Sequence, residues 1–135
     1  MKLAEFAFPG PLRDKLVAAI LRGEKTTTSG LLVEYEHYGE DLPTEGEREL
    51  LVDSDEHGVA VIETTEVRQL PLSEVDLEHA AGEGEGFETV ARWRTEHEKF
   101  WHSDKMRAVL RDPDFTVGDE TIVVTQRFHV VERLS

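Results

Sequence analysis

The end of the chain is a long β-type run, and it constrains the fold more than any other feature of the sequence. Residues 119–134, DETIVVTQRFHVVERL, are rich in β-branched residues and partly alternate between apolar and polar positions. Three helical patterns separate this run from the earlier strand-like segments. Because an unpaired strand exposes its backbone groups, the last strand must return to the first ones. We therefore expect an α+β fold with a small mixed β-barrel and flanking helices.

The earlier strand-like segments lie in the first half of the chain. Residues 42–70 resemble two strands joined by a polar turn at 53–58, which predicts a hairpin. Residues 25–38, KTTTSGLLVEYEHY, are interpreted as an irregular extended segment that is interrupted at Ser29 and Gly30. The lysine and threonines of this segment would then lie where a helix gives way to a strand.

Four helices are expected around these strands. Residues 11–23 begin with a proline, carry apolar residues on one face and end at a glycine, which predicts a helix. A short helix follows Pro71, and we expect Ser73 to cap it. Residues 87–102 show a longer helical pattern, and a further short helix is expected at 105–110.

Length and composition indicate one globular domain over residues 1–135. No apolar run approaches the roughly 20 residues needed to cross a bilayer, and Glu5 interrupts the N-terminal segment where a secretory signal would need an apolar core. We therefore expect a cytoplasmic protein with no membrane partner. The sequence has no cysteine, which excludes disulfides, thiolate metal sites and cysteine nucleophiles.

The formal net charge of −14 bears on the choice of partner. Affinity for polynucleotides comes largely from lysine and arginine side chains that neutralise phosphates, so tight binding that ignores nucleotide sequence is disfavoured. A small neutral ligand, or a short nucleotide held in a locally basic pocket, tolerates a negative field better.

Two polar segments are candidates for chemistry. GEKTTTSG, residues 23–30, offers one cation and three threonine hydroxyls, and a hydroxyl becomes a nucleophile when a neighbouring group removes its proton. AAGEGEGFETV, residues 80–90, alternates Glu83 and Glu85 with glycines, and two such carboxylates suit general acid and base roles. The alternatives are a threonine-rich strand with a solvated lysine and an acidic connection between helices.

An aromatic stripe is the third candidate. Trp93, His97, Phe100 and Trp101 share a helix face beside Arg94, so the rings could stack a nucleobase and the arginine could contact a phosphate. Core packing explains the same spacing, and we assign Trp93 and Phe100 to the core. The six histidines are dispersed and lack metal-binding spacing, so no metal site is expected.

The ordered motifs resemble the ASCH domain family of the PUA-like superfamily. GEKTTTSG after an amphipathic helix is followed by YEHYGEDLP, a β-rich TTEV segment, HAAGEGEG, WRTEHEKFW and the closing IVVTQRFHVV. The resemblance covers nearly the whole chain. It implies a PUA-like barrel whose cleft, beside the lysine–threonine loop, handles RNA or modified nucleosides without a cofactor.

One branch of this superfamily hydrolyses N(4)-acetylcytidine with a lysine, a threonine and a glutamate. The resemblance carries these roles onto Lys25 as the activating group, Thr28 as the nucleophile and Glu83 as the residue that moves protons. The short amidohydrolases have an arginine two residues after the threonine, where this chain has Gly30. The expected substrate-binding residues are Thr26, Ser29, Tyr35, Glu85 and Arg94.

The sequence leaves three functions open. The leading one is hydrolysis of a modified nucleoside of the acylated cytidine type. The alternatives are a metal-independent ribonuclease acting on single-stranded RNA, as reported for other ASCH proteins, and a non-catalytic RNA-binding module. The expected partner is a nucleoside or short single-stranded RNA rather than DNA, and the sequence does not fix the oligomeric state.

Overall fold

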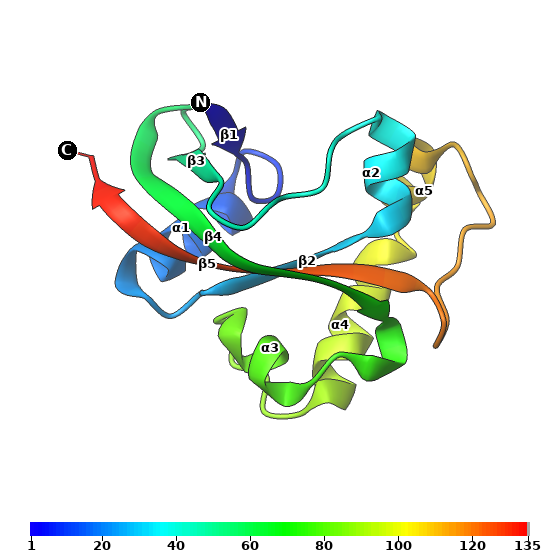
Figure 1. Cartoon of the computed structure of the whole chain (residues 1–135). Coiled ribbons are helices and arrows are strands. Elements are labelled where there is room, and N and C mark those ends of the chain that lie inside the picture. The colour runs from blue at the N-terminus through cyan, green and yellow to red at the C-terminus, as the bar shows by residue number, and fades with distance from the viewer. Residues whose placement is uncertain (135) are drawn as a thin grey trace.

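A computed structural model describes residues 1–134, whose strands form one curled, mixed sheet (Figure 1). The sheet order is β1-β3-β4-β5-β2. β1 pairs in parallel with β3, and every other neighbouring pair is antiparallel. The strand bounds are β1 Lys2–Ala4, β2 Thr27–Leu31, β3 Arg48–Val52, β4 Gly58–Pro71 and β5 Ile122–Arg133.

The expected return of the last strand is confirmed, but the expected closed barrel is wrong. β5 lies between β4 and β2, whereas β1 and β2 are the two edges of the sheet and do not pair. A cavity of about 660 Å³ lies between these edges, lined by residues 2–4 of β1 and 28–30 of β2. With only three residues, β1 offers few hydrogen bonds for closing the sheet across this gap.

The long β4–β5 pair crosses the molecule and bends (Figure 1). Its register shifts between Val61 and Ile62 and again between Thr64 and Glu66, and such bulges bend a strand and increase its twist. Two apolar clusters form against the sheet, one around Trp93 and Trp101 and the other around Ile20 and Phe128.

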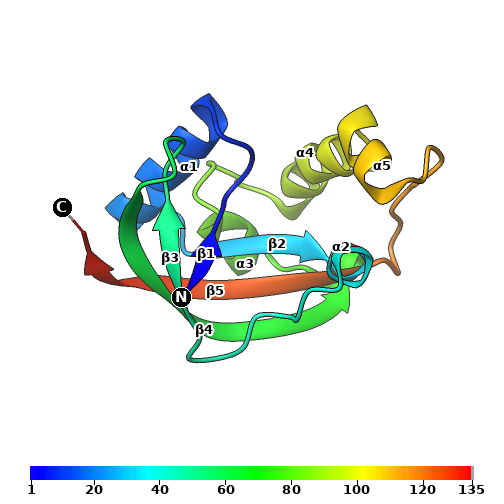
Figure 2. The same ribbon diagram turned by 90° about the horizontal axis from the view of Figure 1, so that it is seen from above.

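Helices cover the sheet unevenly. Figure 2 shows α1 and α4 towards opposite ends of one side, with the chain that follows α3 passing between them. The predicted helices are all present, and the first has the expected Pro11 and Gly23 at its ends. The helix bounds are α1 Pro11–Arg22, α2 Leu32–Tyr38, α3 Leu77–Gly82, α4 Val90–Trp101 and α5 Asp104–Leu110, with a 3₁₀ turn at Leu72–Glu74.

Part of the expected extended segment is helical. Residues 32–38 form α2, because the Glu34 carboxylate accepts the backbone N–H of Leu31 at 3.2 Å and so caps the first turn. Gly39, with a φ of 65°, ends the helix in the left-handed conformation. The extended segment therefore ends at Leu31, the residue that caps α2.

Two further expectations about the helices are wrong. Asp76, not Ser73, caps α3, since its Oδ1 accepts the backbone N–H of His79 at 2.9 Å while Ser73 lies in the preceding 3₁₀ turn. Trp93 is fully buried as expected, but Phe100 is 50% exposed. Phe100 lies at the edge of the apolar face of α4, where it borders a cavity rather than the core.

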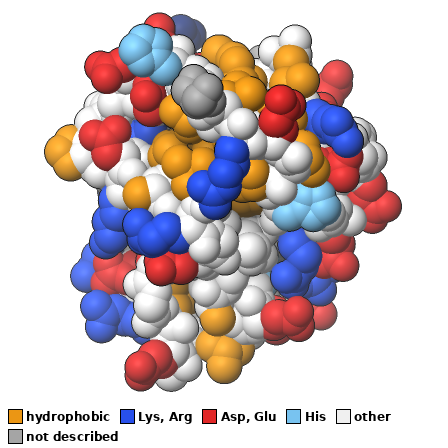
Figure 3. Space-filling model, turned by 90° about the vertical axis from the view of Figure 1, so that its left-hand side faces the viewer, with side chains coloured by type: hydrophobic (Ala, Val, Ile, Leu, Met, Phe, Trp, Pro, Cys, Tyr) orange, Lys and Arg blue, Asp and Glu red, His pale blue; other side chains and the backbone are white. Residues whose placement is uncertain are grey.

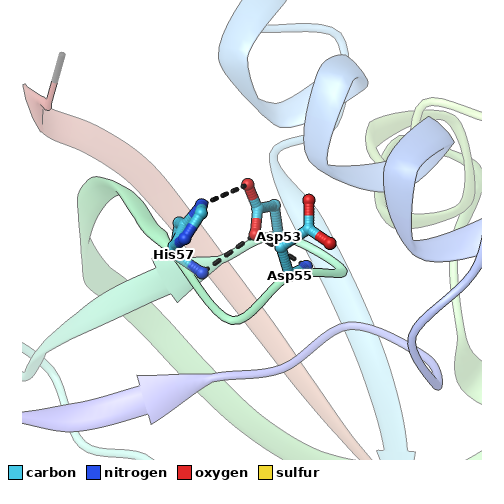
Figure 4. Close-up of side chains that lie close together, drawn as sticks. All are labelled: Asp53, Asp55 and His57. Carbon is cyan, nitrogen blue, oxygen red and sulfur yellow. Dashed lines mark hydrogen bonds and ion pairs between the residues drawn. The ribbon is translucent and has the colours of Figure 1, made fainter.

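The predicted hairpin is confirmed, and its turn is held by one carboxylate (Figure 4). Asp53 Oδ1 accepts the backbone N–H groups of Asp55 and His57, both at 2.9 Å. These contacts close the turn between β3 and β4.

Charges are mixed on the face in Figure 3, where acidic and basic side chains surround a central apolar patch. No continuous basic surface is visible on that face. Among residues 1–134, no helix is both long and apolar enough to cross a membrane.

Candidate active site

The lysine–threonine segment and the glycine-spaced acidic segment meet, as the sequence predicted. Lys25 lies between α1 and β2, and Glu83 follows α3. Lys25 Nζ lies 3.7 Å from Glu83 Oε1 and donates to the carbonyl oxygens of Thr27, at 2.8 Å, and Glu83, at 3.3 Å. Both side chains are buried, so two segments 58 residues apart share one ion pair.

Glycine explains how closely these segments approach. Gly84 has a φ of +73°, and a Cβ there would lie 2.8 Å from the carbonyl oxygen of Glu24 and 2.9 Å from Lys25 Cα. The backbone N–H of Thr26 also donates to the carbonyl oxygen of Gly82 at 2.7 Å. At Gly84 the glycine therefore allows close approach of another segment of the same chain.

The carboxylate of Glu83 is the centre of the site. Its Oε2 accepts from Ser29 Oγ at 2.8 Å and from the indole N–H of Trp93 at 2.5 Å, and its Oε1 lies 3.3 Å from His97 Nε2. Burial alone would raise the pKa of Glu83, but hydrogen bonds from histidines and the nearby positive charges outweigh it. The pKa therefore lies well below the ordinary value of 4.5, and Glu83 is ionised at neutral pH.

Burial has the larger effect on Lys25, whose pKa shift favours the neutral form. Its side chain is buried, and this loss of hydration lowers the pKa of its amine more than Glu83 and Glu85 raise it. A lysine with a lowered pKa releases its proton more readily than an exposed one, so Lys25 is suited to act as a base.

A cavity of about 460 Å³ opens beside this ion pair. α1 and α4 form its two sides, and its walls include aromatic rings that suit a planar ligand. The rings are those of Phe6, Phe87, Phe100 and Trp101. The predicted site residues that line it are Lys25, Thr28, Ser29, Glu83 and Glu85.

The other predicted site residues lie elsewhere. Thr26 lines a small separate cavity beside β5. Arg94 donates to Glu98 at 2.7 Å and to Asp119 at 2.6 Å and does not line the cavity beside Lys25. Tyr35 lines the cavity between the sheet edges, where burial and nearby acidic groups raise its pKa to about 12.

Tyr35 also occupies the space next to Gly30. A Cβ at Gly30 would lie 3.4 Å from the Tyr35 ring, so this ring fills the space beside the glycine. The two cavities share Thr28 and Ser29 in their walls. They therefore adjoin at β2, which carries the expected nucleophile Thr28.

Sequence reasoning missed His79, the contact of His97 with Glu83 and the hydrogen bond from Trp93 to the same carboxylate. His79 Nε2 lies 2.6 Å from Ser29 Oγ, and His97 stacks on Trp93 with ring centroids 4.3 Å apart. Two signals were available: His79 precedes Glu83 by four residues on a helical pattern, and Trp93 and His97 have the same spacing.

Replacing Trp93 by phenylalanine tests how firmly the carboxylate is held. The variant lacks a short hydrogen bond to a charged acceptor, so we expect the free energy of unfolding to fall by about 1.5–3 kcal/mol in urea titrations at pH 7. Trp101→Phe removes the same ring volume at a buried position and serves as the control. An equal loss in both variants would contradict a specific role for the indole N–H.

The stability difference should also depend on pH. Because the folded-state pKa of Glu83 is depressed, its contacts stabilise the fold above about pH 4.5. That contribution disappears as the pH falls through the folded-state pKa. We therefore expect the excess destabilisation of Trp93→Phe over Trp101→Phe to shrink in acid.

Comparisons with known proteins agree with this architecture. The family model of the ASCH domain matches residues 5–132. A crystal structure of an ASCH domain from Lactobacillus crispatus JV V101 superposes with a TM-score of 0.83 at 26% identity, covering 98% of this chain and 80% of that one. The crystal structure of a protein from Enterococcus faecalis V583, of family model DUF984, superposes with a TM-score of 0.76 at 28% identity. The match covers 89% of this chain and 69% of that one.

No protein with a curated description matches the sequence. The match to the family model nevertheless extends over nearly the whole chain, and the solved ASCH domain shares the fold. ASCH domains are generally RNA-related. The chain therefore belongs to the ASCH domain family.

Proposed function

We propose that this protein hydrolyses the acyl group of a modified nucleoside of the N(4)-acylcytidine type. The observation that carries the proposal is the buried Lys25–Glu83 pair, which borders a cavity that Thr28 also lines. In the proposed reaction the Thr28 hydroxyl attacks the acyl carbon while the amine of Lys25 takes the hydroxyl proton. Glu83 then passes a proton to the departing exocyclic nitrogen.

The charge around the cavity favours a neutral substrate. Its walls carry two lysines and one arginine, Lys15, Lys25 and Arg92, against four carboxylates, Glu34, Glu83, Glu85 and Glu96. A polyanion gains little from such a rim, whereas a nucleoside carries no phosphate. With the net charge of −14, this supports amide hydrolysis over cleavage or binding of long RNA.

The aromatic walls support the nucleoside part of the proposal. A nucleobase is planar and apolar on both faces, so it stacks favourably on rings such as Phe87 and Phe100. Ser29 and Glu85 supply polar groups near the same wall for its edge and sugar. Tyr35 lines the adjoining cavity, beside Gly30.

The test is release of cytidine from N(4)-acetylcytidine, followed by chromatography. We expect turnover by the native chain and at least about a hundredfold less by Lys25→Ala, because the base is removed. Circular dichroism of the variant checks that it remains folded. Equal release by Lys25→Ala would discard the assigned roles, and binding without turnover by the native chain would favour an RNA-binding module.

A further inference from the structure

A carboxylate that remains ionised at neutral pH has no proton of its own to donate. Glu83 has this problem, since five nitrogen or hydroxyl groups surround its two oxygens. Under the proposed function, however, the departing nitrogen must receive a proton at this point. The proton must therefore come from one of the neighbours of Glu83.

The contacts of His97 identify it as that neighbour. Its Nδ1 lies 2.9 Å from the carbonyl oxygen of Trp93, and its Nε2 lies 3.3 Å from Glu83 Oε1. A carbonyl oxygen and an ionised carboxylate only accept hydrogen bonds, so both ring nitrogens carry hydrogen and the ring is an imidazolium. Burial lowers the pKa of His97, but the contacts with Glu83 outweigh this effect, so the net shift is upward.

The other candidate donors are less suited. Ser29 already donates its hydroxyl hydrogen to Glu83 Oε2, and the indole of Trp93 does not ionise in this pH range. His79 Nε2 lies 2.6 Å from Ser29 Oγ but 3.5 Å from Glu83 Oε2, so its closer contact is with the hydroxyl. It also faces the oxygen that Ser29 and Trp93 already occupy, not Oε1. Lys25 is committed to receiving the proton of Thr28 in the same step.

We propose that His97 stores the proton that Glu83 passes to the departing nitrogen, so that the acid of the site is a His97–Glu83 pair. The inference rests on the proposed function and deepens it. Glu83 Oε1 makes longer contacts than Oε2, which makes it the oxygen freer to exchange a proton. His97 acts through Glu83 and is therefore a positioning residue that also holds charge.

The steps balance as follows. Lys25 first releases its ammonium proton to solvent, a loss that its lowered pKa favours. Thr28 Oγ then bonds to the acyl carbon and loses its proton to the neutral amine of Lys25; the carbon–nitrogen bond breaks, and the nitrogen takes a proton through Glu83 from His97. The products are free cytidine, an acyl ester on Thr28 and a neutral His97. Water then attacks the ester and returns a proton through Glu83 to His97, while Lys25 returns one to Thr28 as the acid leaves.

The surroundings of His97 favour its charged form. Aromatic rings enclose it, since it stacks on Trp93 and lies 6.0 Å from Phe87 and 5.3 Å from Trp101, and a cation over such faces is stabilised. The charged groups that share its cavity from other elements are Lys15, Lys25, Glu34, Glu83 and Glu85. Those on its own helix are Arg92 and Glu96.

The first experiment needs no turnover. Proton–carbon NMR of the imidazoles follows each histidine against pH, and we expect His97 to titrate above its ordinary value of 6.5. Glu83→Gln removes the negative partner and should move the His97 titration downward. A neutral His97 at pH 6.5 in the native chain would overturn the inference whatever the substrate is.

The second experiment compares two substrates in His97→Gln. We expect kcat for N(4)-acetylcytidine to fall about a hundredfold, because its nitrogen needs a proton to leave, and the pH profile should lose one ionisation. Hydrolysis of p-nitrophenyl acetate, whose leaving group needs no proton, should change by less than about threefold. His57→Gln, at an exposed position, is the control and should match the native chain for both substrates.

The possible outcomes distinguish a failure of the proposed function from a failure of the proposed role of His97. If the native chain hydrolyses neither N(4)-acetylcytidine nor the ester, the proposed function fails. If the native chain is active and His97→Gln loses both substrates equally, His97 is only structural and the inference fails. An unchanged pH profile in His97→Gln would overturn it as well.

Discussion

Thr28→Ala is expected to lower kcat for N(4)-acetylcytidine by about a thousandfold or more, because the Thr28 hydroxyl is the group that forms the acyl ester in the proposed reaction. Thr28 makes this prediction specific, since it is the threonine of its segment that lines the cavity beside Lys25. The measurement is the initial rate of cytidine release at saturating substrate. Mass spectrometry of the native chain, quenched during turnover, should show an acetyl group on Thr28.

Thr26→Ala is the matched control. The two threonines lie two residues apart, but Thr26 lines a separate cavity beside β5. Its substitution should leave the rate within about threefold of the native value. A larger loss in Thr28→Ala would then show that the position of the hydroxyl matters, and not merely the loss of a threonine from this segment. A Thr28→Ala protein that keeps a tenth or more of the native rate would rule out this hydroxyl as the nucleophile.

Gly84→Ala is expected to lower the free energy of unfolding by about 3 kcal/mol or more. The added Cβ would meet backbone atoms of Glu24 and Lys25 at 2.8–2.9 Å, and the residue would also hold an unfavourable positive φ. Neither neighbour is the end of a flexible side chain, so the acidic segment must move away from Lys25. Thermal unfolding followed by circular dichroism should show a fall of roughly 12 °C.

Gly86→Ala separates the clash from the backbone strain. Gly86 has a φ of +80°, similar to that of Gly84, but nothing lies within 4 Å of an added Cβ. We expect a loss of about 1–2 kcal/mol there from the left-handed conformation alone. If the free energy of unfolding fell equally in both variants, the close approach of the two segments would not explain the loss in Gly84→Ala.

Much of the fold could be predicted from local signals. Pro11 and Gly23 bound the first helix, and the polar turn after Val52 joins the hairpin strands, because these residues fix the backbone directly. Whether the sheet closes into a barrel could not be predicted from such local signals. It depends on the summed twist and lengths of five strands, and the three-residue β1 is too short to reveal itself by alternation.

Part of the candidate site could likewise be predicted from the sequence, and part could not. The pairing of Lys25 with Glu83 was expected from family resemblance, since nothing in their spacing brings together residues 58 positions apart. His97 was assigned to an aromatic stripe, because periodicity shows which residues share a helix face but not which buried acceptor they meet. Its contact with Glu83 depends on how α4 packs against the segment after α3.

The two tryptophans of the chain, Trp93 and Trp101, are both buried within this site, and the sequence contains no other. One donates to the carboxylate and the other lines the cavity. All indole fluorescence therefore originates within a few ångströms of the place where a nucleoside would bind. Ligand affinity can be titrated by intrinsic emission on the unlabelled native protein, with no reporter attached to perturb it.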